Sequence, residues 1–248
     1  MNYHSSFKIF RVLHSSCYQR LCLSQLVGIQ NVLCPVQNRP ICLSKSCRGI
    51  ATQKSTAVDG NIFKRTLKKI KFYTIDKSRM KVLGYYLYES VADKVPHIWF
   101  FKEMSLPDTF NSWFLVTELH VWMLMVKAME LGNNGRVIRN YIVEAMWADV
   151  SMKSRKLGAE NYSAAREQTK LLGDQFQAAL VTYDEGLLSD DKVLASALWR
   201  RFFERSCNDP KNLETMVKYV RMQMKYLDNL TEEDYRACHI KWLPPEKT

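Results

Sequence analysis

The chain has 248 residues, 47% hydrophobic and 25% charged, which is enough for one globular domain with or without a tail. Its net charge of +11 is concentrated near the N-terminus: residues 1–58 hold seven Lys and Arg and no acid, whereas residues 83–248 hold 21 basic and 23 acidic side chains. The main part of the chain is therefore close to neutral, so its charge gives no argument for a nucleic-acid surface there. No apolar stretch reaches the ~20 residues that a membrane-spanning helix needs.

The first 50 residues have the composition of a mitochondrial transit peptide, since they contain Ser and Arg and lack acids. On a helical wheel, apolar residues between Phe7 and Leu21 fall on one side, while Lys8 and Arg11 fall on the other, as in the amphipathic cationic helices of such peptides. A disordered basic tail without a role in import is the alternative. We expect processing near residues 48–51, followed by a basic linker and helix over residues 51–76.

From about residue 62 onward, nearly the whole chain is predicted to be helical, because apolar residues recur at every third or fourth position and no strand-like alternation is sustained. The predicted fold class is all-α: a single compact multi-helix domain over residues 77–230, preceded by a disordered N-terminal tail and followed by a C-terminal tail over residues 231–248. We expect six or seven helices, over about residues 62–73, 78–95, 110–131, 136–157, 161–183, 191–205 and 210–228, with an aromatic connection at residues 99–101.

Residues that favour helix ends mark most of these boundaries. Asp108 or Thr109 is placed to cap the helix that follows, and Asn161 the helix after Gly158. The segment Gly132-Asn133-Asn134-Gly135 predicts a turn between two helices, and Asp209-Pro210 predicts a helix start with proline at its first position.

Glu118 and His120 raise the question of a metal site in the most apolar predicted helix. Residues two apart do not share a helix face, and no Glu-x-x-His pair is present, so a structural role is favoured for both. The sequence contains no catalytic-triad order, phosphate-binding loop or dinucleotide-binding glycine pattern. We therefore predict no catalytic residue, no metal site and no cofactor.

Four carboxylates fall within eight residues, which is compatible with acid/base chemistry, a divalent cation or a basic partner segment. Helix ends explain them as well, because one pair precedes Gly186, where we expect a turn, and the other opens a helix. We favour this structural reading for Asp184, Glu185, Asp190 and Asp191.

A cluster of five basic residues lies in the first predicted helix. Such clusters neutralise phosphates without reading sequence, so ribosomal RNA and anionic lipid are both candidate partners, and a solvated basic face is the alternative. This candidate docking surface consists of Lys64, Arg65, Lys68, Lys69 and Lys71.

An aromatic row starts near residue 99 and continues through the helix beginning at about residue 110. Aromatic residues at helical spacing usually form a core, but with six Trp and eleven Met the domain has enough apolar side chains to leave some on the surface. The row therefore predicts either core packing or an exposed anchor for a partner.

Three blocks of sequence together resemble one known family. The first runs from Pro107 to Leu115; the second contains Tyr183-Asp184-Glu185-Gly186, Leu188-Ser189-Asp190-Asp191, Leu198-Trp199-Arg200 and Phe202-Phe203; the third contains Leu213, Val217 to Arg221 and Tyr226-Leu227-Asp228. In this order, over about residues 95–230, the blocks resemble the ubiquinol-cytochrome c chaperone family, assembly factors of mitochondrial respiratory complex III.

The resemblance implies a non-enzymatic chaperone in the mitochondrial matrix, peripherally associated with the inner membrane. With a small helical partner, also a complex III assembly factor, it would bind newly synthesised cytochrome b and support its translation, stability and assembly, and the mitochondrial ribosome is a further candidate partner. The alternative is an RNA- or ribosome-binding helical adaptor without a cytochrome b client.

We expect the partner and client surface to be built, or supported from within, by residues 108–122 and 183–203. The candidate residues are Asp108, Phe110, Trp113, Phe114, Trp122, Tyr183, Asp184, Glu185, Asp190, Asp191, Trp199 and Phe203.

Overall fold

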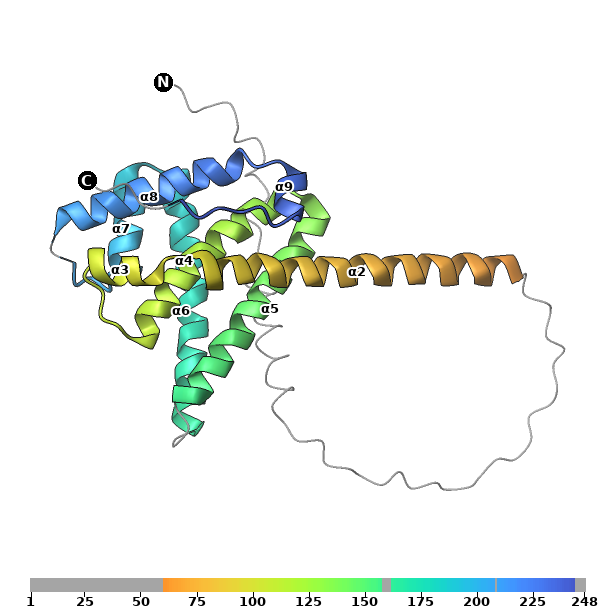
Figure 1. The fold of residues 1–248 in the computed structure, drawn as a ribbon, viewed down its shortest axis with the longest axis horizontal. Helices are drawn as coiled ribbons and strands as arrows, with labels where there is room; N and C mark the ends of the chain where they lie inside the picture. Colours follow the sequence, from red (N-terminus) through yellow and green to blue (C-terminus); the bar gives the residue numbers. More distant parts are fainter. Residues whose placement is uncertain (1–59, 158–161, 208, 244–248) are drawn as a thin grey trace. The chain divides into compact units, whose positions relative to one another are not determined.

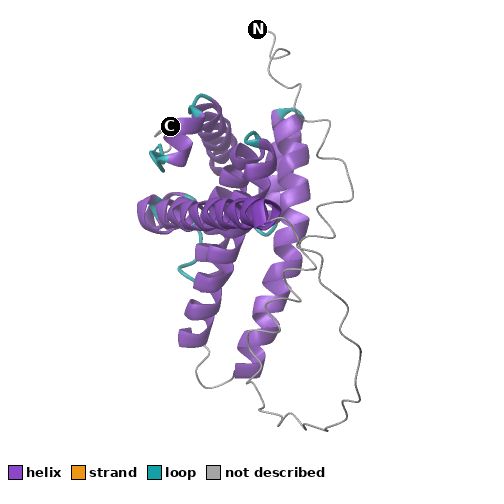
Figure 2. Ribbon diagram, turned by 90° about the vertical axis from the view of Figure 1, so that its right-hand side faces the viewer, coloured by secondary structure: helices purple, strands orange, loops and turns teal. Residues whose placement is uncertain are grey.

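The computed structural model describes residues 60–157, 162–207 and 209–243, with side chains from residue 76 onward apart from Tyr162 and Ala165. These residues form α-helices and no strand (Figures 1 and 2), which confirms the all-α prediction. The helices are α2 (Gly60–Lys94), α3 (His97–Glu103), α4 (Phe110–Met129), α5 (Gly132–Leu157), α6 (Tyr162–Leu188), α7 (Asp191–Arg201), α8 (Pro210–Asp228) and α9 (Glu232–Arg236).

The chain divides after Ile75, and residues from Asp76 onward form one compact unit. The predicted transit peptide over residues 1–50, the linker up to residue 59 and the predicted cap Asn161 lie outside the described residues.

Helix α4 is the centre of this unit, because 15 of its 20 residues are buried. Helices α3, α5 and α8 pack directly on it, while α7 contacts both α6 and α8 (Figure 1). A helix that is apolar on all sides must be surrounded by other elements. The same apolar composition does not make α4 a membrane span, since no described helix is both long and apolar enough to cross a bilayer.

Three predicted helix starts are confirmed by their capping hydrogen bonds. Of the two candidates before α4, it is Thr109 that accepts the bond, from the Ser112 amide at 3.2 Å. The side chains of Asp190 and Asp209 accept bonds from the first turns of α7 and α8, at 3.0 and 2.9 Å, and Pro210 occupies the first position of α8. Each cap satisfies an amide that the helix itself leaves without a partner.

Several boundaries differ from the prediction because helices continue through residues expected to break them. The segments expected as two helices before residue 95 form the single helix α2, and the aromatic connection at residues 99–101 lies inside α3. Helix α6 continues to Leu188, so Asp184 and Glu185 lie within a helix and not in a turn. Helices α3 and α9 were not expected, and the described helices number eight where six or seven were expected.

Two glycines expected to form turns instead allow helices to approach closely. A Cβ on Gly186 would lie 2.9 Å from the Leu194 Cα, so the absence of a side chain lets α6 and α7 meet there. A Cβ on Gly135 would lie 1.7 Å from the Ala128 carbonyl oxygen, closer than two atoms can be without a bond. Among the glycines that the structure describes, only Gly132, with φ +62°, has the left-handed conformation that a turn glycine commonly supplies.

Residues 232–243 pack against the unit after α8. Tyr235 on α9 is fully buried and donates a hydrogen bond from its hydroxyl to the Leu124 carbonyl at 2.9 Å. The indole Nε1–H of Trp242 donates to the Ser90 carbonyl on α2, also at 2.9 Å. Two buried aromatic side chains thus connect the end of the described chain to α4 and α2.

The paired glycines at the start of α5 give a direct stability test. Gly135→Ala is expected to reduce the free energy of unfolding by about 3 kcal/mol or more, because the new methyl group forces α4 and α5 apart. Gly132→Ala is the matched control: its Cβ meets nothing within 4 Å, so it bears only the left-handed strain of about 1 kcal/mol. Urea denaturation followed by circular dichroism measures both, and equal losses would contradict the close approach.

Candidate functional site

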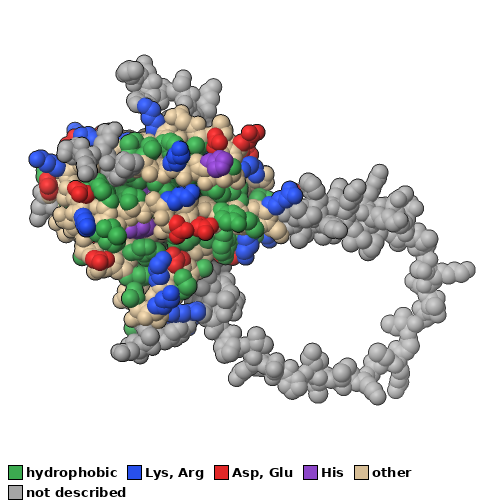
Figure 3. All heavy atoms as spheres, in the orientation of Figure 1, with side chains coloured by type: hydrophobic (Ala, Val, Ile, Leu, Met, Phe, Trp, Pro, Cys, Tyr) green, Lys and Arg blue, Asp and Glu red, His purple; other side chains and the backbone are tan. Residues whose placement is uncertain are grey.

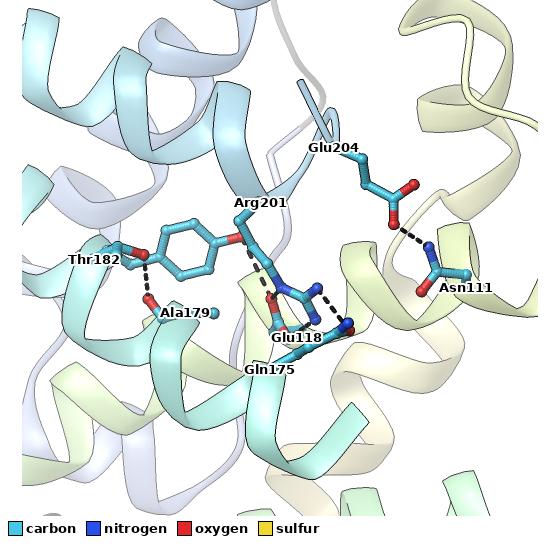
Figure 4. Close-up of polar contacts among 8 residues, drawn as sticks. Asn111, Glu118, Gln175, Ala179, Thr182, Arg201 and Glu204 are labelled. Atoms are coloured by element: carbon cyan, nitrogen blue, oxygen red, sulfur yellow. Dashed lines mark hydrogen bonds and ion pairs between the residues drawn. The ribbon is translucent and has the colours of Figure 1, made fainter. Parts of the chain in front are cut away.

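A buried ion pair joins the two blocks predicted to build the functional surface. Glu118 on α4 has no exposed side chain and accepts two hydrogen bonds from Arg201 on α7: Nε to Oε1 at 2.8 Å and Nη2 to Oε2 at 2.6 Å (Figure 4). The remaining Nη1 of Arg201 donates to Gln175 Oε1 at 3.1 Å, and the Tyr183 hydroxyl lies 3.5 Å from Glu118 Oε1. This two-point geometry is the strong form of an Arg–carboxylate pair.

Burial acts on both members of the pair. Burial raises the pKa of Glu118, and the hydrogen bonds and charge of Arg201 oppose that rise. For Arg201, burial disfavours the charge, but the hydrogen bonds and negative charge of Glu118 outweigh it and raise the pKa of the guanidinium. Each charge is therefore tolerated inside the domain only because the other is present.

Two further hydrogen bonds join the same blocks. The indole Nε1–H of Trp122 donates to Asp184 Oδ1 on α6 at 2.8 Å, and burial raises the pKa of Asp184 to about 6 despite this bond. At the surface, Asn111 Nδ2 donates to Glu204 Oε1 at 2.6 Å (Figure 4). Residues 108–122 and the segment from residue 183 to just beyond Phe203 thus form one packed structure.

His120 is buried and forms hydrogen bonds inside the domain. Its Nδ1 lies 2.7 Å from the Val116 carbonyl, so this nitrogen carries the proton, and Nε2 then accepts a hydrogen bond from the Tyr219 hydroxyl at 2.6 Å. Phe100 and Trp242 pack against the ring in T-shaped geometry, with centroids 5.4 and 4.8 Å away. Burial lowers the pKa of His120 to about 3, so the ring is neutral at physiological pH.

These polar groups do not converge on one reactive position. Glu118 is bound to Arg201, His120 to Tyr219 and Val116, and Asp184 to Trp122, while Glu185 is exposed. Within the described residues, no group of three or more His, Cys, Asp and Glu side chains is arranged to hold a metal ion, and no buried side-chain polar atom lacks a partner. The arrangement suits the packing of helices.

The predicted surface residues fall into two groups by exposure. Four are buried, at 0–3% exposed, and can take part only by supporting the surface from within: Phe114, Trp122, Tyr183 and Phe203. The others reach the surface wholly or in part: Asp108, Phe110, Trp113, Asp184, Glu185, Asp190, Asp191 and Trp199.

Some exposed members also have structural roles. Asp190 caps α7, and Asp191 binds Arg221 at 2.9 Å. Trp113 is covered by the Lys153 ammonium, 4.1 Å from its ring centroid, and stacks on Phe110 at 5.4 Å. The lysines and arginine at residues 64–71 lie in the helical backbone of α2, but their side chains are not described, so the basic docking surface stays a prediction.

The structure contains a groove between α2 and α5 that was not predicted from the sequence. Its volume is about 860 Å³, and it is lined by residues 78–93 of α2 and residues 145–153 of α5. One feature of the sequence could have indicated the groove, because α2 has a second apolar side. Leu83, Leu87 and Val91 form the side that faces the core, whereas Val82, Tyr85 and Tyr86 lie on a different side of the helix. Elsewhere the visible surface mixes acidic, basic and hydrophobic side chains without a field of one charge (Figure 3).

The described residues thus define an all-helical domain with a satisfied polar interior and an apolar surface groove. A family model described as ubiquinol-cytochrome C chaperone matches residues 102–242, more than half of the chain. The chain belongs to the ubiquinol-cytochrome c chaperone family.

Individual relatives agree with this assignment. The chain is 52% identical over 196 residues to ubiquinol-cytochrome c reductase complex assembly factor 1 of Drosophila melanogaster, covering 77% of this chain and 76% of that protein. It is 43% identical over 169 residues to the Homo sapiens protein of the same name, covering 68% of this chain and 56% of the relative. The crystal structure of the Cbp3 homolog from Brucella abortus superposes with a TM-score of 0.57 at 18% identity, covering 72% of this chain and 97% of that one, and shows that the fold is shared.

Because Glu118 and Arg201 are buried together, replacing one of them is expected to reduce the free energy of unfolding more than replacing both. Arg201→Met leaves a carboxylate buried without a partner and is expected to reduce the free energy of unfolding by about 3–5 kcal/mol. The double variant Glu118→Leu, Arg201→Met buries no charge and is expected to recover most of that loss. Urea denaturation of the wild type, both single variants and the double variant measures the coupling, and additive losses would contradict a desolvated pair.

The raised pKa of Asp184 predicts that the stability of the domain depends on pH. Since its folded-state pKa of about 6 lies above the ordinary value, this residue favours the folded state in acid, and that contribution is lost as pH rises through about 6. Asp184→Asn keeps an acceptor for Trp122 and is expected to raise the free energy of unfolding at pH 7.5 by up to about 3 kcal/mol, and by much less at pH 4. Exposed Asp174 on the same helix is the matched control, and Asp174→Asn with an equal effect would contradict the prediction.

Proposed function

We propose that this protein is a non-enzymatic assembly factor of mitochondrial respiratory complex III. The observation that carries the proposal is the family match over residues 102–242, together with 52% identity, over 77% of the chain, to a ubiquinol-cytochrome c reductase complex assembly factor. A chaperone acts by binding. The engagement of Glu118, His120 and Asp184 in helix packing supports such a role, because these groups are occupied in holding the domain together.

In this function the protein binds newly synthesised cytochrome b together with a small helical partner, and supports the translation, stability and assembly of cytochrome b. A client with apolar segments requires apolar side chains on the surface of its chaperone. Ten large apolar side chains of the described residues are 36–72% exposed. The proposed surface includes the exposed members of the two sequence blocks, from Asp108 to Trp113 and from Asp184 to Trp199.

The proposed location is the mitochondrial matrix, in peripheral contact with the inner membrane. The acid-free composition of residues 1–50 supports import, and a relative from Saccharomyces cerevisiae, 30% identical over 150 residues, is named as mitochondrial. The basic residues between Lys64 and Lys71 supply positive charge that suits either ribosomal RNA or anionic lipid.

Depletion and rescue in the protein's own cells test the proposal. Cells lacking the chain are expected to lose assembled complex III on native gels while complex IV is retained, and the tagged wild-type chain is expected to restore it. After pulse labelling of mitochondrial translation, the tagged chain is expected to co-purify labelled cytochrome b and a small helical protein.

The same cells separate this function from its alternative. Assembled complex III at normal levels in the depleted cells would contradict the proposal. Recovery of RNA or ribosomes without cytochrome b, with binding that falls steeply as salt rises, would favour an RNA-binding adaptor. Charge reversal at two exposed positions, Asp108→Lys and Glu185→Lys, tests the surface, because unchanged recovery of both the partner and the client would remove these residues from it.

A further inference from the structure

We infer that the groove between α2 and α5 is the docking site for one amphipathic helix of a partner protein, with an apolar face and a basic end. The inference rests on the proposed binding function and assigns it a surface and a ligand chemistry. It is carried by the shape of the groove, the exposure of its walls and the distribution of charge along it.

The groove arises from a close crossing of two helices. A Cβ on Gly84 of α2 would lie 2.5 Å from the Cβ of Tyr141 on α5, so the backbones are as near as this glycine permits. Further along α5, the lining residues include the small side chains of Ala145 and Ala148. Helices that touch at one point diverge on either side of it, and small residues do not fill the wedge that opens, so a hollow of about 860 Å³ remains.

The walls of the groove expose large apolar side chains. Val82, Tyr85 and Tyr86 on α2 are 53%, 38% and 57% exposed, and Met152 on α5 is 51% exposed. Single exposed apolar side chains are ordinary on protein surfaces, whereas several around one hollow mark a binding surface. Tyr and Met are also side chains that make favourable contacts in interfaces.

Positive charge within the groove is already neutralised. The Lys81 ammonium binds Glu144 at 3.0 Å, and the Lys153 ammonium binds Asp149 at 2.6 Å. Asp149 also accepts a hydrogen bond from the Tyr88 hydroxyl at 2.6 Å. Both lysines that line the groove thus have a carboxylate partner, which makes the groove less attractive to the phosphate of a lipid headgroup.

Negative charge remains unpaired toward the C-terminal end of α2. Glu89 and Asp93 are four residues apart, which places them on one side of the helix, and both are exposed and line the groove. Neither forms an ion pair with any residue that the structure describes. A ligand that buries its apolar groups beside Val82 and Tyr86 therefore gains most when it also places Lys or Arg near Glu89 and Asp93.

The dimensions favour one face of a helix. The wall from Val82 to Asp93 rises about 16 Å, the length of a helix of about 11 residues. The side chains on the walls of the groove are exposed, so a helix lying between them keeps its opposite side in water. This geometry suits an amphipathic segment of a water-soluble protein better than a uniformly apolar membrane-spanning segment.

A synthetic peptide series tests the inference on the full-length chain. The probe is a fluorescein-labelled 14-residue peptide of Ala and Gln with Leu at every third or fourth position and two Lys at its C-terminus. Fluorescence anisotropy is expected to show binding at least tenfold tighter than that of a scrambled peptide of the same composition, and tighter than that of a peptide ending in two Glu. Equal binding of all three peptides would overturn the inference.

Matched variants locate the binding. Val82→Asp with Met152→Asp is expected to weaken binding of the Lys-ended peptide at least tenfold, whereas Val181→Asp, at a 64% exposed position on α6, is expected to leave it unchanged. Glu89→Lys with Asp93→Lys is expected to reverse the preference toward the Glu-ended peptide. Thermal melts followed by circular dichroism confirm that each variant is folded, and a groove variant that binds like the wild type would overturn the inference.

Other occupants give different results. Binding of anionic phospholipid vesicles that Val82→Asp abolishes, without peptide binding, would assign the groove to lipid, and concentration-dependent dimerisation lost in the same variant would assign it to a second copy; both overturn the inference. Groove variants that bind no peptide yet restore complex III in depleted cells would overturn the groove assignment alone. Normal complex III in the depleted cells would overturn the proposed function itself.

Discussion

The paired burial of Glu118 and Arg201 is the constraint on which the arrangement of the helices depends. Glu118 lies in the middle of α4, a helix enclosed by its neighbours, where an isolated carboxylate is strongly unfavourable. Arg201 satisfies both carboxylate oxygens from the C-terminal end of α7. A shift of α7 along α4 would separate these charges, so the pair specifies the register of α7, and through the close contact at Gly186 the position of α6.

Two other polar groups inside the domain, His120 and Asp184, also have pKa values shifted by burial. Their contributions to the stability of the domain change with pH in opposite directions. The neutral ring of His120 contributes stability above its ordinary pKa, and this contribution is lost as pH falls toward about 3. The carboxyl group of Asp184 contributes stability in acid and loses it as pH rises through about 6. Between about pH 4 and 6 the two contributions oppose each other, so together they change the free energy of unfolding with pH less steeply than either group alone.

The interior and the surface of the domain have separate tasks. The family match covers α4 to α8 and the segment through Trp242, and these elements contain the buried ion pair, His120 and its neighbours Tyr219 and Trp242. The groove combines α5, which lies within the matched residues, with the part of α2 that precedes them. A scaffold whose polar groups are satisfied internally remains rigid, which leaves exposed apolar and acidic side chains to meet partners without reorganising the core.

The sequence by itself determined the all-α class, the family, and the helix starts after Asp108-Thr109, at Asp190 and at Asp209, because these depend on local periodicity, capping chemistry and residue order. The choice of Thr109 over Asp108 as the cap came from the structure. The tertiary structure alone decided which apolar residues are buried and where the chain forms a groove. Phe114 and Trp113 are neighbours in one aromatic row, yet one is in the core and the other is partly exposed. Gly135 and Gly186 suggest turns in the sequence, but the helices that cross there require them for contact. Such outcomes depend on which distant helix packs against each residue, and local sequence does not contain that information.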